Sequence, residues 1–278
     1  MSSDVMPMTE HRPRRQRSQS SGATDAALLF DEPGPRGRIL IAIGSVVAVI
    51  GIAALAAAVL YRLDLAGQLD YPKWRYFLGQ SVVSQLLEAA GTTLTLGGVA
   101  AVLTFPLGIA LGWLRLLDNR PIKWLIGLWI DAMRAVPMLL LVYFFLLVVP
   151  RFATISDFWK LALPIVMCTS ATTAEVFRSG VRALDRGQTE AAWALGMSPS
   201  LTMRLILAPQ ALRLMLPTLI TQMVTIIKGT TLAYVLAYPE LMYRGSTMIG
   251  QAKIDAHLSV FFQTYVIIAV LYIIVNWS

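Results

Sequence analysis

Apolar residues gather into long runs along this chain, and short polar segments separate them. The runs are about 20 residues or longer, which is the length an α-helix needs to cross a hydrocarbon core of roughly 30 Å. Within lipid only helices or closed barrels satisfy every backbone hydrogen bond, and runs of this length favour helices. We therefore predict an all-α, polytopic membrane protein with about six transmembrane helices, at 38–61, 86–114, 124–149, 160–180, 214–237 and 259–277.

Charged residues are few and unevenly placed. The chain of 278 residues is 56% apolar and 14% charged, whereas soluble proteins carry roughly a quarter charged residues. With the N-terminus inside, lysine and arginine are about twice as frequent in the inner segments as in the outer ones. The net charge of +7 is therefore a topology signal that predicts a cytoplasmic N-terminus. It does not indicate a nucleic-acid partner.

Three regions follow from these patterns. Residues 1–37 are rich in Ser, Pro and Arg, so we predict a disordered basic cytoplasmic arm. Its arginines at positions 12–17 either contact anionic lipid headgroups or are simply solvated. Residues 38–85 hold an extra first span and an outer segment, and residues 86–278 hold the other five spans. The single cysteine, Cys168, and two widely separated histidines predict neither an intramolecular disulfide nor a metal site.

The longest inner loop, residues 181–213, carries dense helix signals. Gln188 or Thr189 can cap a helix whose first turn holds Glu190, where the helix dipole favours an acid. Gly196 ends this helix after a stretch rich in alanine. We expect a low-profile helix that fits a groove on another protein. By composition alone, an ordinary amphipathic surface helix is an equally good interpretation.

The same loop then restarts a helix. Ser198 is suited to cap it and Pro199 to occupy its first turn. Pro209 predicts a further break. The loop should therefore hold two short helices in a bent arrangement.

The residues of this loop also match a known pattern. Glu190-Ala191-Ala192 is followed after three residues by Gly196, and after nine more by Ile206 and Ala208-Pro209. This spacing resembles the EAA loop of the membrane subunits of ATP-binding-cassette importers, although that family usually has leucine where this chain has Ala208. In the family, the short helix docks in a cleft of a cytosolic ATPase and transmits its closure. The resemblance implies a coupling set of Glu190, Ala191, Ala192, Leu195, Gly196, Ile206 and Pro209.

Three further segments narrow the resemblance. Residues 133–140, 174–180 and 228–232 are similar to segments that permeases of the polar amino acid (His/Glu/Gln/Arg/opine) family carry in the same order. The resemblance runs from 91 to 278 and implies a type I importer transmembrane domain, over 86–278, preceded by one extra span. The extra span and residues 234–243 look most like the second permease subunit of actinobacterial glutamate uptake systems.

Charged residues within the apolar spans are functional candidates, because a charge inside a membrane is costly without a partner or water. Arg134 either extends to the interface or has a role in transport. Glu175 either forms a structural ion pair with Arg178 or Arg134 or takes part in gating. Lys228 either binds a solute carboxylate or pairs with Glu175 or a partner subunit. The candidate translocation pathway comprises Arg134, Pro137, Glu175, Gln222, Lys228, Thr230 and Thr231.

The sequence contains no phosphate-binding loop and no nucleophile–base pair, so we predict a non-catalytic subunit without a cofactor of its own. The resemblance implies a cytosolic ATPase dimer that holds ATP and Mg, a second homologous permease and an extracytoplasmic amino acid-binding protein. Together they would import polar amino acids, glutamate first, across a bacterial plasma membrane. The alternatives are a secondary transporter or channel driven by an ion gradient, or a membrane-anchored assembly protein. The chain stops at the last span without the basic tail that such permeases often have, which indicates a truncated sequence.

Overall fold

A computed structural model describes residues 34–277 of the chain, which divides into two units between Leu65 and Ala66. In the first unit the described residues form one helix, α2 (Pro35–Leu65), long and apolar enough to cross a membrane. It contains the predicted first span. The predicted basic arm, including the arginines at 12–17, lies almost entirely outside the described residues.

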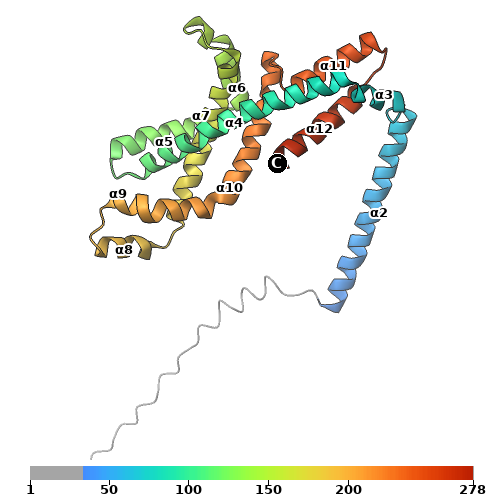
Figure 1. The fold of residues 1–278 in the computed structure, drawn as a ribbon. Helices are drawn as coiled ribbons and strands as arrows, with labels where there is room; N and C mark the ends of the chain where they lie inside the picture. Colours follow the sequence, from blue (N-terminus) through green and yellow to red (C-terminus); the bar gives the residue numbers. More distant parts are fainter. Residues whose placement is uncertain (1–33, 278) are drawn as a thin grey trace, which may run out of the picture. The chain divides into compact units, whose positions relative to one another are not determined.

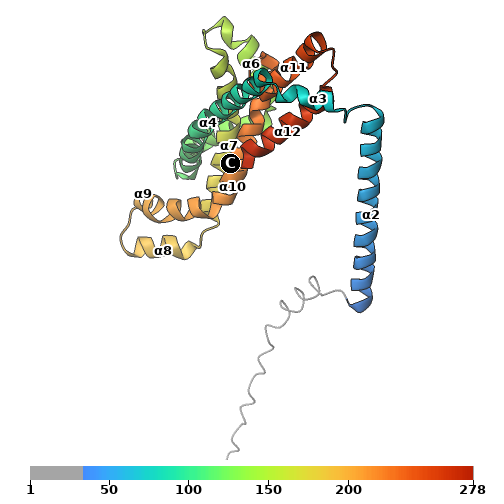
Figure 2. The same ribbon diagram turned by 45° about the vertical axis from the view of Figure 1, so that its right-hand side comes forward.

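The second unit is entirely helical in the part that the structure describes, which confirms the predicted fold class (Figures 1 and 2). Its elements are α3 (Tyr71–Arg75), η1 (Tyr76–Leu78), α4 (Gln80–Leu116), α5 (Arg120–Ala135), α6 (Met138–Leu147), η2 (Val149–Arg151), α7 (Asp157–Arg182), α8 (Arg186–Ala194), α9 (Pro199–Thr202), η3 (Met203–Leu207), α10 (Ala208–Gly229), η4 (Thr230–Leu236), α11 (Leu241–Asp255) and α12 (Phe261–Trp277).

The core of this unit is the pair α4 and α7, which contact each other more extensively than any other two elements described. Small residues make this contact possible. Gly108 and Gly112 of α4 lie directly against the backbone of α7, so that no side chain fits between the two helices. Thr104 and Thr169 share a buried hydrogen bond of 2.8 Å across the same interface. Helix α10 packs against both α7 and α4 (Figure 1).

The predicted third span, 124–149, is not one straight helix. Helix α5 ends at Ala135, Val136 is extended, and α6 begins at Met138, with a bend of 95° between the two helical segments. Pro137 explains the break, because proline lacks the N–H that would continue α5 and forces the residue before it out of the helical region. The pair α5–α6 is thus a broken span or a re-entrant segment.

By length and composition, three described helices can cross a membrane alone, and the count becomes four if the bent pair is one span. The three are α2, α4 and the continuous segment Pro199–Leu236, which joins α9, η3, α10 and η4. The other two predicted spans correspond to α7, which carries many polar residues, and to α12, which is apolar and has 17 residues.

Within the second unit, the segment that follows Leu65 packs against α12. Gln68 O accepts a hydrogen bond of 2.5 Å from Gln263 Nε2 of α12. A buried apolar cluster joins residues from η1, α4, α11 and the loop residue just before α12: Phe77, Val82, Leu86, Met248, Ala252 and Val260.

Candidate functional site

Helix α8 lies where the resemblance placed the coupling helix, and specific caps define both of its ends. The prediction that Gln188 or Thr189 caps it was wrong: the helix begins earlier, at Arg186, and Asp185 accepts a 2.7 Å hydrogen bond from the Gly187 N–H. An aspartate immediately before a helix is a strong cap, so the signal was present in the sequence.

The end of α8 agrees with the prediction. Gly196 adopts a left-handed conformation with φ +78°. Its N–H donates to Trp193 O at 2.9 Å, and the Met197 N–H donates to Ala192 O at 3.0 Å. These two bonds form a Schellman motif, which requires a residue with positive φ and therefore favours glycine.

The faces of α8 differ in exposure. Ala192 is buried, and the helix contacts α9 and η3 on that side. Glu190 is exposed, and Trp193 and Leu195 are 56% and 82% exposed. Two large apolar side chains thus project from a polar loop. Helix α8 lies at the end of the second unit far from α11 (Figures 1 and 2). Exposed apolar residues in such a place are typical of a docking surface.

The predicted break at Pro209 does not occur. Ser198 and Pro199 start α9 as expected, but the helix then continues through a π-helical turn, Met203–Leu207, into α10. In this turn the Ala208 N–H bonds to Met203 O, five residues earlier. A π turn shifts the hydrogen-bond pattern just before Pro209, so that the missing proline N–H does not end the helix.

The remaining residues of the coupling set anchor this segment. Ile206 is partly buried, while Pro209 is exposed. Ala208, the departure from the family pattern, is buried in a cluster with Phe177 of α7 and Met215 of α10. A small residue fits here because α10 approaches α7 closely.

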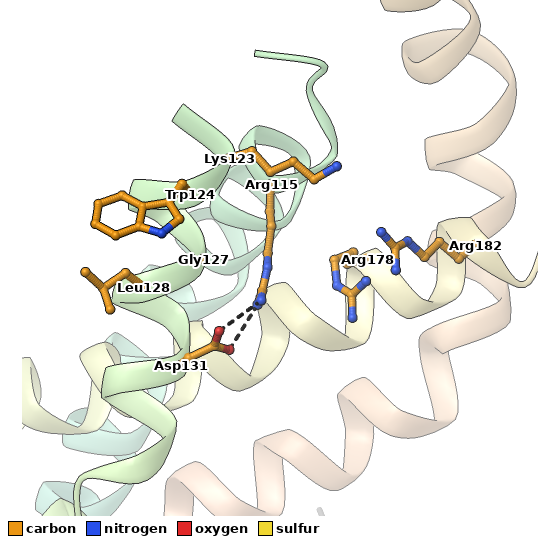
Figure 3. A pocket seen from close by; sticks show the side chains of 8 residues that line it. All are labelled: Arg115, Lys123, Trp124, Gly127, Leu128, Asp131, Arg178 and Arg182. Carbon is orange, nitrogen blue, oxygen red and sulfur yellow. Dashed lines mark hydrogen bonds and ion pairs between the residues drawn. The ribbon is translucent and has the colours of Figure 1, made fainter. Parts of the chain in front are cut away.

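A network of charges joins α4, α5 and α7 near the C-terminal ends of these three helices. Glu175 pairs with Arg178 on its own helix, and with Arg115 of α4 at 3.0 Å. Arg115 also binds Asp131 of α5 at 3.1 Å (Figure 3). The structural ion pair of Glu175 with Arg178 is therefore present. The sequence analysis did not identify Arg115 and Asp131, which lie far from Glu175 along the chain.

Arg134 and Pro137 lie at the bend between α5 and α6. The Arg134 side chain is 44% exposed and its nearest carboxylate, on Asp131, is 4.0 Å away. It does not pair with Glu175 in the structure. Pro137 is exposed and precedes the first residue of α6.

Lys228 is the last basic residue of α10 and borders a cavity of about 490 Å³ that also touches α12. Its lining includes Thr231, Tyr272 and Asn276. No carboxylate among residues 34–277 forms an ion pair with Lys228, so the predicted alternative of pairing with Glu175 is wrong. Gln222 is buried on the same helix.

The helix changes from an α-helix to a 3-10 helix immediately after Lys228 and Gly229. Helix α10 ends at Gly229, and a 3-10 helix follows over Thr230–Leu236. Thr230 is fully buried, and its hydroxyl donates to Ile227 O at 2.7 Å. The Thr231 hydroxyl donates to Lys228 O at 2.8 Å. Both carbonyls also accept from the Thr230 backbone N–H, so the hydroxyls add second donors where α10 passes into the tighter helix.

One buried carboxylate was missed. Glu240 has no exposed surface, and it caps α11 by accepting hydrogen bonds from the N–H groups of Met242 and Tyr243. The hydroxyl of Tyr272 donates to it at 2.7 Å. Burial raises the pKa of the Glu240 carboxyl above its ordinary value, although these hydrogen bonds oppose the shift. The signal available in the sequence was Pro239-Glu240, a turn residue and a cap before an apolar segment.

Known proteins resemble this chain in both sequence and fold. The family model "Binding-protein-dependent transport system inner membrane component" matches residues 104–278. The chain is 33% identical over 187 residues to a probable glutamine ABC transporter permease protein of Bacillus subtilis, covering 67% of this chain and 84% of that protein. It is 32% identical over 217 residues to the glutamate transport system permease protein GluD of the actinobacterium Corynebacterium glutamicum, covering 76% and 77%.

Solved structures agree on the fold. An amino acid ABC transporter crystallised with histidines superposes with a TM-score of 0.63 at 24% identity, covering 71% of this chain and 90% of that chain. An inward-facing MetNI methionine ABC transporter superposes with a TM-score of 0.58 at 16% identity, covering 72% and 94%.

The capped helix α8, the helical membrane unit and these matches agree with one another. The matches confirm the predicted resemblance and the prediction of a non-catalytic membrane component. The chain belongs to the family of binding-protein-dependent transport system inner membrane components, and it is a permease subunit of that family.

Proposed function

We propose that this chain is a permease subunit of an ATP-driven importer of polar amino acids, with glutamate as the first candidate solute. The relatives named for glutamine and glutamate support the solute class. The partners would be a cytosolic ATPase dimer that holds ATP and Mg, a second homologous permease and an extracytoplasmic binding protein. The N-terminus would lie in the cytoplasm of a bacterial cell, on the side of α8.

The observation that carries this proposal is the mechanical link between α8 and the membrane. Helix α8 is closed at both ends and contacts α9 and η3, and the Gln210 side chain bonds to Gln188 at 3.2 Å. From Pro199 to Leu236 the helix is continuous. A displacement of α8 would therefore be transmitted along one rigid element as far as Lys228.

This link explains how ATP binding could drive transport. Closure of two ATPase subunits would draw α8 inward, with Trp193 and Leu195 seated in a groove of the ATPase. The continuous helix would carry this movement to the change from α10 to η4. Opening and closing would then alternate access to the solute route. Lys228 borders that change and would attract the solute carboxylate.

Copurification with the ATPase subunit tests the coupling surface. Leu195→Glu places a charge at the most exposed apolar position of α8 and should abolish copurification. Leu117→Glu is the matched control, because Leu117 is an exposed leucine, 37% exposed, in another predicted inner loop. If both variants retain the ATPase equally, α8 is not the docking element.

Uptake by proteoliposomes tests the energy source and the solute. The reconstituted complex should concentrate labelled glutamate only with ATP inside, and Lys228→Met should reduce uptake about tenfold or more, since loss of a charged hydrogen bond costs roughly 1.5–3 kcal/mol. Unchanged uptake by Lys228→Met would remove this residue from the pathway. If the purified chain alone concentrates glutamate on a proton or sodium gradient, the protein is a secondary transporter and the proposal fails.

A further inference from the structure

A basic cavity lies where α4, α5 and α7 approach the inner loops (Figure 3). Its volume is about 400 Å³. Four cationic side chains, one acidic side chain and three further residues line it: Arg115, Lys123, Arg178, Arg182, Asp131, Trp124, Gly127 and Leu128. We propose that this cavity binds the phosphodiester headgroup of an anionic phospholipid.

The cavity carries an excess of positive charge, which favours an anionic ligand. The two carboxylates near the cavity, Asp131 and Glu175, are already paired with Arg115 and Arg178. Lys123 and Arg182 have no side-chain partner among residues 34–277. The cavity therefore has two cations in excess of its carboxylates, and in Figure 3 the guanidinium of Arg182 turns toward Arg178 while the Lys123 side chain extends above it. A phosphodiester supplies the missing negative charge and several acceptor oxygens.

Ion pairs already hold two of the cationic side chains of the cavity in place. Arg115 is held by Asp131 and Glu175 together. Arg178 is held by Glu175. Two of the four cations are thus already positioned, so that binding would order only Lys123 and Arg182.

The apolar side of the cavity favours a lipid over a small anion. One side of the cavity is apolar and open, because Trp124 is 69% exposed and Leu128 is 52% exposed. Tryptophan favours the interface between headgroups and acyl chains, and basic pockets between transmembrane helices on the cytoplasmic side bind acidic headgroups. A lipid would place its phosphate among the cations and its chains against Trp124 and Leu128. Free phosphate would leave this apolar wall without a partner.

The depth of the site agrees with this interpretation. Arg115 lies in the last turn of α4 and Arg182 in the last turn of α7, while Lys123 lies in the first turns of α5. Helix α8 begins only four residues after Arg182. The cavity is therefore at the membrane boundary on the side of the coupling loop, where the headgroups of one leaflet lie.

Lipid binding to the purified full-length chain tests the proposal. Native mass spectrometry and thermal unfolding should be measured with phosphatidylglycerol, with phosphatidylcholine of the same acyl chains, and with inorganic phosphate. We expect the wild-type chain to bind and be stabilised by phosphatidylglycerol in preference to phosphatidylcholine. Inorganic phosphate at millimolar concentration should neither stabilise the chain nor displace the lipid.

The double variant Lys123→Gln/Arg182→Gln should bind phosphatidylglycerol roughly 30-fold more weakly, since each cation near an acidic surface contributes on the order of a five- to tenfold gain in binding. The matched control is Arg204→Gln/Arg213→Gln, which removes the same charge from exposed positions on η3 and α10 and should leave binding unchanged. Lys123→Arg/Arg182→Lys should restore the preference.

Three results would overturn the proposal. One is a wild-type chain without preference for the acidic lipid, a measurement that does not depend on any variant folding. Another is equal weakening by the control pair, which would indicate a general charge effect. The last is stabilisation by inorganic phosphate equal to that by the lipid, which would make the ligand a free oxyanion.

Discussion

The contact between α4 and α7 allows a sharp test of the packing. In Gly112→Ala the added Cβ would lie 2.6 Å from Ala174 O, 3.0 Å from Phe177 Cδ1 and 3.2 Å from Ala174 Cα. Ordinary contacts of a Cβ are 3.4–4 Å. Two of the three neighbours are backbone atoms in the middle of a helix, so they cannot move as a side-chain end would. Helices α4 and α7 must therefore separate along their whole contact.

The expected cost follows from two opposing effects. Overpacking of a close contact costs about 1–3 kcal/mol, and the better helix propensity of alanine returns up to about 1 kcal/mol. We expect a net loss of about 1–2 kcal/mol, and hence a thermal midpoint lower by roughly 2–8 °C for a chain of this size. The measurement is thermal unfolding of the purified chain in detergent, followed by tryptophan fluorescence.

Gly98→Ala is the matched control, because Gly98 lies on the same helix and a Cβ there meets nothing within 4 Å. Its midpoint should be unchanged or slightly higher. A Gly112→Ala midpoint as high as that of Gly98→Ala would refute the close approach of α4 and α7.

Three further predictions concern caps and charges. Asp185→Ala removes the acceptor for the Gly187 N–H and should destabilise the start of α8 by about 1 kcal/mol. The measurement is amide hydrogen exchange at residues 187–190, which should become faster in Asp185→Ala and return to the wild-type rate in Asp185→Asn. Arg115→Met removes both hydrogen bonds from Arg115 to Asp131, which keeps only Arg134 at 4.0 Å, and one of the two donors to Glu175 Oε2, which keeps Arg178. Because both carboxylates retain a cation, the variant should cost about 1 kcal/mol of stability, less than breaking a fully buried pair. Arg120→Met, at an exposed position, should cost little, and equal midpoints would exclude a structural role for the network. Burial raises the pKa of Glu240 in the folded chain, so its contribution to folding stability is fully present below the ordinary carboxyl pKa and is lost as the pH rises through the raised pKa. The thermal midpoint should therefore fall as the pH rises between these two pKa values, and Glu240→Gln should flatten this dependence. Identical pH profiles of the wild-type chain and the variant would contradict the raised pKa.

Much of the organisation could be predicted from local patterns. The apolar runs indicate spans because the bilayer sets a minimum helix length, and that constraint acts on each segment separately. The end of α8 at Gly196 and the start of α9 at Ser198-Pro199 were predictable for a similar reason. Helix caps depend on one or two residues and their own backbone, so they can be predicted without knowing which other segments the helix contacts.

Other features depended on contacts between distant segments. Pro209 predicted a break, but the π turn before Pro209 lets the helix continue. Ala208, which follows this turn, packs against Phe177 of α7 and holds the turn in place. Pro137 does break its helix. Two prolines in apolar segments therefore have opposite effects, and the difference lies in the packing around each.

The sequence by itself determined that this chain is helical, spans a membrane and presents a small capped helix between two spans, because bilayer thickness and capping chemistry act on neighbouring residues. Only the tertiary structure decided which charges meet. Arg115, Asp131 and Glu175 come from three helices, and their pairing leaves Lys123 and Arg182 without a side-chain partner in the described part of the chain, beside an apolar wall. Glu240 likewise finds Tyr272 only when α11 and α12 pack together. Such pairings depend on distances in space, which the spacing of residues along one chain does not encode.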